Sequence, residues 1–483
     1  MIKNERQYRI TKAQADRFQD VLSQMVAKEA DPTVHPLLFK AQQDAVRSQL
    51  DDLRRELAEY DALRSGERSV LAVEDFNELP RALIKARIAA NLSQKQLADR
   101  LGLKEQQVQQ YESTEYAGAS FTRVLEVIQA LGILVREDVF LPSAQVSKKR
   151  LFQRLQEMGV DRQFAMKRLL PRPLAAWLEA DTKEADVLGS AALQAAAQIG
   201  RVYNVSPSAM FGNGPLDLSA SAVDFARFKM PARVEERKTN AYTVYAHYLS
   251  LLLLEATAHL ERKPVPTNAK AIRADIVRQY GDVTFESAIR YVWGLGIPVL
   301  PLNDPGGFHG ACWRVERRNV IVLKQGAHSL ARWLFDLIHE LSHAGESPEA
   351  ENLAVIEADE TSAERRNSQA EQDASRLAGE VVLDGRAEEL AGKCVRAAGG
   401  KIPLLKAAVG RVASREHVPS GALANYLAWR LSMQGEDWWS TANALQEVGG
   451  DPWRIARDCC SEHIRLEKLN DADRSLLLQA LAD

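Results

Sequence analysis

The sequence predicts a mainly α, multidomain protein: an α-helical hairpin and a helix-turn-helix, followed by an α+β domain with a small sheet and a helical C-terminal region. Three observations support this fold class. Apolar residues recur at helical spacing through most of the chain. They alternate at strand spacing in one stretch, residues 297 to 324. The length of 483 residues is enough for about three domains.

We expect five segments with boundaries set by these changes of pattern. They are an N-terminal helical hairpin at 1–77, a helix-turn-helix at 78–138, a helical linking domain at 139–265, the α+β domain at 266–398 and the C-terminal helical region at 399–483.

Residues 12 to 66 have the pattern of two helices separated at Asp31-Pro32. Proline breaks a helix because it removes a backbone donor and clashes with the preceding turn. The second helix has an apolar seam between charged flanks, with steps of three and four residues. Its members are Val46, Leu50, Leu53, Leu57 and Tyr60. The seam packs either within the chain or against a second copy, so a homodimer is possible.

Short helices joined by tight turns follow from about residue 80 to residue 137. Ser93 can cap a helix over 94–101 with its side-chain oxygen, and Gly102 supplies the turn before a helix over 104–112. The stretch 92–103, together with Val108 and Tyr111-Glu112, resembles the helix-turn-helix of phage-repressor-like regulators, often called the XRE type.

That resemblance implies DNA binding, with the second helix of the motif in the major groove of an operator. Gln106, Gln107 and Gln110 lie on one side of this helix. A glutamine amide can read adenine through two hydrogen bonds. Gln94 and Lys95 would sit near phosphates, where they position the protein without reading sequence.

An alternative is a protein-docking module, in which the glutamines merely solvate the fold. Glu105 and Glu112 favour this alternative, because they put negative charge near the expected phosphates. A second stretch, 196–211, also has the shape of a helix-turn-helix around Asn204-Val205-Ser206-Pro207. It offers only Arg201 for base contact, so we expect helical packing there.

The strand-like stretch 297–324 contains three runs, divided by Pro305-Gly306-Gly307 and by Arg317-Arg318-Asn319. Ser329 can then cap a helix over 330–344. That helix contains His339-Glu340-Leu341-Ser342-His343, the HExxH pattern. Histidines four apart share one helix face, so both imidazoles can reach one tetrahedral zinc while the glutamate faces the open side of the metal.

A catalytic zinc site needs a third protein ligand. Ser368 followed by Glu371 has capping-box spacing, so Glu371 could bond back to the start of its helix. At about 100° per residue, however, Glu371 is in phase with the apolar Ala374, Ala378 and Val382. We therefore expect Glu371 to point inward, as a ligand must.

Taken together, these residues resemble the ImmA/IrrE family of metallopeptidases, which cleave repressors of the helix-turn-helix type. The resemblance covers roughly residues 270 to 390 and implies a zincin-like domain with zinc held by His339, His343 and Glu371. It also implies a small sheet, including Phe308-His309-Gly310, whose edge strand holds a peptide substrate. The chain departs from the family pattern at Ser375, where asparagine is usual, and at 381–384.

If zinc is bound, Glu340 takes a proton from the zinc-bound water and later passes it to the leaving amine. His309 and His328 lie near the motif and could stabilise the oxyanion, but surface or packing roles are the simpler expectation. The acidic, alanine-rich stretch between His343 and Glu371 could be a mobile flap that gates the site.

Composition excludes several other classes. A net charge of -3 gives no global attraction to nucleic acid or to a membrane. Four scattered cysteines are too few for a disulfide framework and fit a reducing cytosol. The charged residues 1–6 do not suggest a secretory signal, and the greasiest run, 251–254, is far too short to span a bilayer. We therefore expect a cytoplasmic protein.

The Trp438-Trp439 pair is typical of a core.

The leading hypothesis is thus a DNA-binding transcriptional regulator fused to a zinc-dependent endopeptidase. The peptidase would cleave a repressor, an antitoxin-like protein or the chain itself in response to a signal. The alternative is a non-proteolytic transcription factor whose peptidase-like domain senses a metal or a ligand. The intact Glu340 argues for the enzyme, since a pure sensor has no need of a base there.

Overall fold

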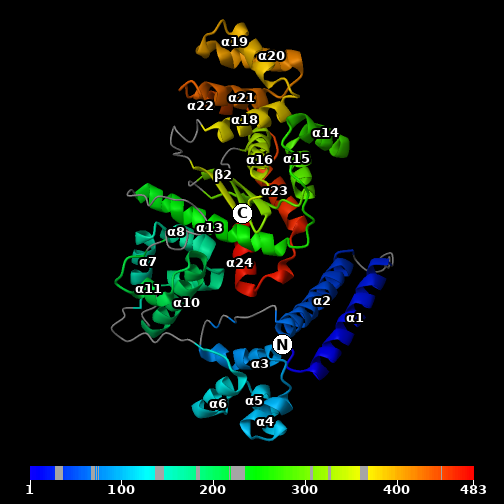
Figure 1. The fold of residues 1–483 in the computed structure, drawn as a ribbon, viewed down its shortest axis with the longest axis vertical. Coiled ribbons are helices and arrows are strands. Elements are labelled where there is room, and N and C mark those ends of the chain that lie inside the picture. The colour runs from blue at the N-terminus through cyan, green and yellow to red at the C-terminus, as the bar shows by residue number, and fades with distance from the viewer. Residues whose placement is uncertain are drawn as a thin grey trace. The chain divides into compact units, whose positions relative to one another are not determined.

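In the computed structural model the chain divides into two compact units, Met1–Val139 and Phe140–Asp483 (Figure 1). The structure describes the chain except for residues 28–35, 67–70, 72, 74–75, 136–145, 181–184, 217, 219–233, 305–307, 325–327, 359–367, 448 and 483. The described part is mainly helical and contains a four-stranded mixed sheet. None of its helices is long and apolar enough to cross a membrane.

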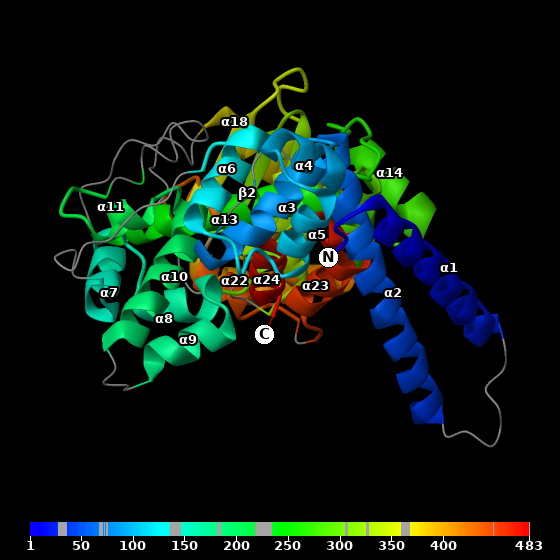
Figure 2. The same ribbon diagram turned by 90° about the horizontal axis from the view of Figure 1, so that it is seen from below.

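The first unit consists of a helical hairpin and a bundle of short helices. Its helices are α1 (Glu5–Ala27), α2 (Pro36–Ser65), α3 (Leu79–Ala89), α4 (Gln94–Leu101), α5 (Glu105–Ser113) and α6 (Phe121–Leu131), with a 3-10 turn at Phe76–Glu78. In both views α1 and α2 lie side by side (Figure 2). Asp31-Pro32, the expected break between them, lies outside the described residues.

The apolar seam of α2 packs within the chain. Leu50 and Tyr60 are buried, and the other three seam residues are half-buried. The ring of Tyr60 lies 5.0 Å from that of Tyr8 on α1, measured between centroids. Tyr60 also belongs to the same apolar cluster as Leu83 and Leu97 of the short helices. This cluster therefore spans the boundary that we expected at residue 77.

The second unit surrounds the sheet with helices. Its helices are α7 (Lys148–Glu157), α8 (Arg162–Phe164), α9 (Arg172–Glu179), α10 (Ala185–Tyr203), α11 (Pro207–Phe211), α13 (Val234–Ala256), α14 (Ala269–Tyr280), α15 (Phe285–Gly294), α16 (Leu330–Ala344), α18 (Gln369–Val382), α19 (Ala387–Ala397), α20 (Leu405–Glu416), α21 (Ser420–Ser432), α22 (Trp439–Asn443), α23 (Pro452–His463) and α24 (Asp471–Ala480). A π-helical turn at Ala165–Leu169 and 3-10 turns at Ile402–Leu404 and Leu466–Lys468 complete the set.

The sheet contains the three strands expected from the sequence and one that was not expected. The strands are β1 (Val299–Leu302), β2 (Phe308–Val315), β3 (Arg318–Lys324) and β4 (Leu353–Ala358), in the order β1-β3-β2-β4. β1 runs parallel to β3, and the other pairs are antiparallel. β4 lies within the stretch that we interpreted as a flap, so for these six residues that interpretation is wrong. The run contains the strand-forming Val355 and Ile356, and its pairing with β2 satisfies the backbone groups along that edge of β2.

Helices cover both faces of this sheet. α16 packs against β2 and β3 on one face, and α13 packs against the same strands on the other (Figure 1). α18 and α21 in turn pack on α16. One apolar cluster runs through the whole unit and crosses the boundaries expected at residues 265 and 398. The stretch 196–211 contributes buried residues to this cluster, and its Arg201 pairs with Asp473 at 2.8 Å, consistent with a packing role.

Candidate functional site

α16 carries the HExxH residues into the interior of the second unit. The helix begins as expected, because the Ser329 hydroxyl accepts a hydrogen bond from the backbone N–H of Arg332 at 3.2 Å. His339, Glu340 and His343 are 4%, 0% and 1% exposed. Polar side chains of this kind are buried at a cost unless they find partners. The partners of the two histidines come from α18 and from the loop that follows α16.

Glu371, in the first turn of α18, meets both histidines. Its Oε2 lies 3.2 Å from His339 Nε2 and 3.6 Å from His343 Nε2, and the two Nε2 atoms are 3.0 Å apart. Ligand atoms about 2.1 Å from a tetrahedral zinc would lie about 3.4 Å from one another. The three residues therefore fit a metal centre. In the described part of the chain they are the group of three potential metal ligands whose ligand atoms lie within 4.8 Å of one another.

Glu371 takes part in the cap of α18 through its backbone N–H, and its side chain does not bond back to the helix start. The Glu371 N–H donates to Ser368 Oγ at 3.3 Å, which is the ordinary N-terminal cap of α18. The carboxylate instead points at the histidines. Glu371 thus contributes its backbone N–H to the helix start and its carboxylate to the candidate ligand set.

The outer nitrogens of the two imidazoles are also bonded. His343 Nδ1 lies 2.6 Å from Glu346 Oε1, and His339 Nδ1 lies 3.2 Å from Ser375 Oγ. Bonds of this kind orient a ligating histidine and leave its Nε2 for the metal. Sequence reasoning missed Glu346, although its spacing of three from His343 was a usable signal. The hydroxyl that bonds to His339 comes from Ser375, a position where the resemblance implied asparagine.

The three candidate ligands form a charged network. Burial by itself lowers the pKa of His343, but hydrogen bonds with Glu346 and Glu371 outweigh burial and raise this pKa to about 9. Burial raises the pKa of Glu371, yet its hydrogen bonds with the two histidines hold that pKa well below the usual range of a carboxyl. Both pKa shifts favour an anionic carboxylate that faces a protonated imidazole, and a divalent cation in the site would compete with that proton.

The side chain of Glu340 extends from α16 towards β2 of the sheet. A Cβ atom at Gly310 of β2 would come within 2.2 Å of Glu340 Oε1, so the glycine makes room for this carboxylate. The neighbouring Cys312 also has its thiol pKa raised by burial and by the charge of Glu340. His309 lies in β2, but its side chain is outside the described part of the structure, and His328 is exposed. Trp438 is buried and Arg332 stacks on Trp439 at 4.1 Å, so this pair packs on α16.

The short helices of the first unit have the expected local signals. Ser93 forms a capping box with Gln96 at the start of α4, and Gly102 ends that helix with a left-handed φ of 66°. α5 follows within a few residues and buries Val108. These features confirm the predicted helix, glycine turn and second helix.

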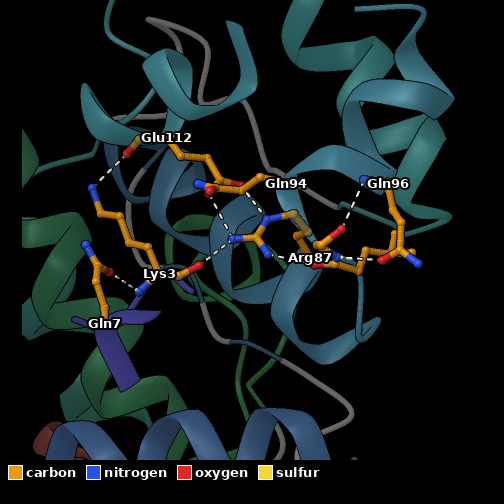
Figure 3. Close-up of polar contacts among 8 residues, drawn as sticks. Lys3, Gln7, Arg87, Gln94, Gln96 and Glu112 are labelled. Carbon is orange, nitrogen blue, oxygen red and sulfur yellow. Dashed lines mark hydrogen bonds and ion pairs between the residues drawn. The ribbon is translucent and has the colours of Figure 1, made fainter. Parts of the chain in front are cut away.

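A buried ion pair ties α3 to α5. Arg87 donates to both carboxylate oxygens of Glu112, at 2.5 and 2.8 Å, and the two residues are 3% and 0% exposed (Figure 3). Gln94 Nε2 donates to the same carboxylate at 2.7 Å. Lys3 closes the network, since its carbonyl accepts from Arg87 at 2.6 Å and its ammonium donates to the carbonyl of Glu112 at 2.7 Å.

This network corrects one of our expectations. We expected Glu112 to put negative charge near DNA phosphates, but the residue is buried and its charge is balanced by Arg87. Gln94, expected near a phosphate, is half-buried and turns its amide towards Glu112 instead. The residues expected to contact bases or phosphates that remain exposed include Lys95, Gln106 and Gln110.

Gln107 is exposed but has a local structural role. Its Oε1 accepts from the backbone N–H of Lys104 at 3.1 Å and so caps the start of α5. Glu105 is exposed as expected, and it accepts from Gln109 at 3.0 Å. Gln106 and Gln110 are exposed on α5, and neither caps the helix start as Gln107 does or bonds to Glu105 as Gln109 does.

Comparison with known proteins adds one finding. A helix-turn-helix family matches residues 83–137, which include most of α3 and all of α4, α5 and α6. These residues form a helix-turn-helix domain of the XRE type, and the match supports a DNA-binding transcription regulator. No curated protein and no solved structure matches the chain.

Proposed function

We propose that the chain is a transcription regulator whose second unit is a zinc-dependent peptidase, acting on a repressor, an antitoxin-like protein or the chain itself. The observation that carries this proposal is the convergence of His339, His343 and Glu371 within 3.0 to 3.6 Å of one another in a buried site. The HExxH helix, the small sheet and these three residues are also the features in which the chain resembles the ImmA/IrrE metallopeptidases.

The residues of the site divide the work of peptide hydrolysis. A zinc ion held there would lower the pKa of a bound water and polarise the scissile carbonyl. Glu340 would accept the proton of that water and deliver it to the leaving amine. Ser375 and Glu346 would hold the imidazole rings in place. β4 ends the sheet order, so a substrate peptide could add to its outer edge as a further strand.

The direct test is Glu340→Gln. We expect this variant to keep its zinc and to lose about 10²- to 10⁴-fold in the rate of peptide cleavage, because only the base is removed. Zinc-loaded full-length protein would be incubated with a proteome-derived peptide library, and new peptide termini would be read by mass spectrometry. Glu349→Gln, a change of an exposed glutamate in the loop after α16, is the matched control.

Two outcomes would contradict the peptidase, and a third measurement would favour its alternative. If zinc-loaded wild-type protein leaves both the library and itself intact, the chain is not a peptidase. If the zinc-loaded protein cleaves nothing and zinc changes its affinity for DNA, the non-proteolytic sensor becomes the better account. If Glu340→Gln cleaves as fast as wild type, the cleavage comes from a contaminating protease.

The DNA-binding part of the proposal predicts two separable effects. Gln110→Ala should cost about 1–3 kcal/mol of discrimination at one base pair, because an exposed amide of α5 is removed. Lys95→Ala should weaken binding to all sequences alike and reduce the salt slope by about one. Both are measured on duplexes selected from a random pool, titrated between 50 and 200 mM salt.

Gln109→Ala provides the control for these variants, since Gln109 is exposed on the same helix but bonds to Glu105. It should leave both the sequence preference and the salt slope unchanged. Retention on DNA that does not depend on salt, or no retention at all, would favour the protein-docking module.

A further inference from the structure

One buried arginine connects the sheet to the end of the ligand helix. Arg314 of β2 is 3% exposed and lies opposite Asn319 of β3, whose Oδ1 accepts from its Nε at 2.7 Å. Its other nitrogens donate to four backbone carbonyls, one on the last residue of α16 and three in the loop that follows this helix. These are the carbonyls of Ala344 at 2.8 Å, Glu346 at 2.8 Å, Ser347 at 2.6 Å and Ala350 at 3.4 Å.

This set of contacts uses all five N–H donors of the guanidinium. Ala344 is the last residue of α16, where helix carbonyls lack partners within the helix and a positive charge is favourable. Asn319 Nδ2 also donates to the Ala344 carbonyl, at 3.0 Å. The arginine and the asparagine thus act as one clamp on the helix end.

The clamped loop contains the residue that orients a metal ligand. Glu346 Oε1 lies 2.6 Å from His343 Nδ1, and the carbonyl of Glu346 is one of those held by Arg314. The next residue, Ser347, has φ of 43°, a left-handed conformation that is unfavourable for a residue with a side chain. Such a conformation persists only where neighbouring contacts hold it, and Arg314 supplies the contact to its carbonyl.

We propose that Arg314 is a positioning residue for the metal centre: it fixes the backbone of residues 344–350, which places Glu346, which in turn orients His343. The inference rests on the proposed function, because it assumes that the centre binds zinc. Lysine at position 314 would keep the positive charge. Its single ammonium group could not bond all the acceptors that the planar guanidinium of arginine reaches. The geometry, rather than the charge, is therefore the property to test.

The experiment is a double-mutant cycle on the zinc affinity of the full chain. Arg314→Lys, Glu346→Gln and the double variant would be stripped of metal, checked for folding by circular dichroism, and titrated with zinc against a chromophoric chelator. We expect each single change to weaken zinc binding about 10- to 100-fold. The zinc affinity of the double variant should be little lower than that of the more damaged single variant, because both changes act on the same contact.

Arg318→Met is the matched control. Arg318 also lies in the β2–β3 region and also holds backbone carbonyls, those of Leu254 and Thr257, at 2.5 and 2.9 Å. Its loss should destabilise the fold without changing the zinc affinity. If Arg314→Lys does not fold, Asn319→Ala takes its place in the cycle, with a smaller loss that is again not additive with Glu346→Gln.

The outcomes separate the inference from the proposed function. Arg314→Lys with wild-type zinc affinity, or losses that multiply in the double variant, would overturn the role of Arg314 in a chain that still binds zinc. An equal loss in Arg318→Met would do the same, since it would mean that any damage to the sheet is felt at the metal. A wild-type chain that binds no zinc would overturn the proposed function and this inference with it.

Discussion

A chain carrying His343→Ala is expected to lose nearly all of its zinc. Changes in residues that merely orient a ligand already cost about 10- to 100-fold in metal affinity, and removing a ligand should cost more. Glu371→Ala should have the same effect, because its carboxylate lies 3.2 and 3.6 Å from the Nε2 atoms of His339 and His343. Metal content of the purified proteins, measured by mass spectrometry, checks both variants.

His328→Ala is the control, since this exposed histidine lies just before α16 and should leave zinc near one per chain. Zinc lost from His343→Ala but retained in Glu371→Ala would mean that another residue is the third ligand. If wild-type protein holds no zinc even after the metal is added back, the peptidase would have to be abandoned. A DNA-binding regulator without this chemistry would then remain.

The second large effect is expected in the first unit. Arg87→Met leaves the carboxylate of Glu112 buried without its cation, which should cost about 3–5 kcal/mol. Loss of the bond to the Lys3 carbonyl adds to this. Hydrogen–deuterium exchange of the full chain measures the effect, and exchange in α3, α4 and α5 should accelerate by roughly a hundredfold or more.

Peptides from the second unit serve as an internal reference, because their exchange should not change. Arg81→Met is the matched variant: Arg81 also pairs with a glutamate, Glu115, but its side chain is 63% exposed. Surface pairs of this kind contribute about 0–1 kcal/mol. Similar exchange rates for Arg87→Met and Arg81→Met would show that the buried pair does not hold the helices together.

The features that the sequence predicted correctly are those encoded locally. Ser93 and Gly102 mark the ends of a helix because a cap and a left-handed turn are decided within a few residues. His339 and His343 share a face because helix geometry alone requires it. Glu371 was found by its phase within its own helix, and the structure places it beside both histidines.

The features that were missed or misjudged depend on tertiary contacts. β4 is recognisable only with β2 beside it, since Leu353–Ala358 is short and alanine-containing and lies in an acidic stretch. Glu112 looked like a surface acid because its partner, Arg87, belongs to another helix. Arg314 sits in an ordinary strand pattern, and nothing near it in the sequence indicates that it binds carbonyls 30 residues later.

The contacts made by Arg314 have a consequence for sequence drift in this part of the chain. They go to backbone carbonyls of residues 344, 346, 347 and 350, not to side chains. Any residue offers the same carbonyl, so the exposed positions 348 and 349 can exchange side chains while the loop keeps its path, whereas the left-handed φ of Ser347 restricts which residues fit there. Homologues that share this clamp should therefore vary at these exposed positions but retain arginine at 314 and an acidic residue at 346.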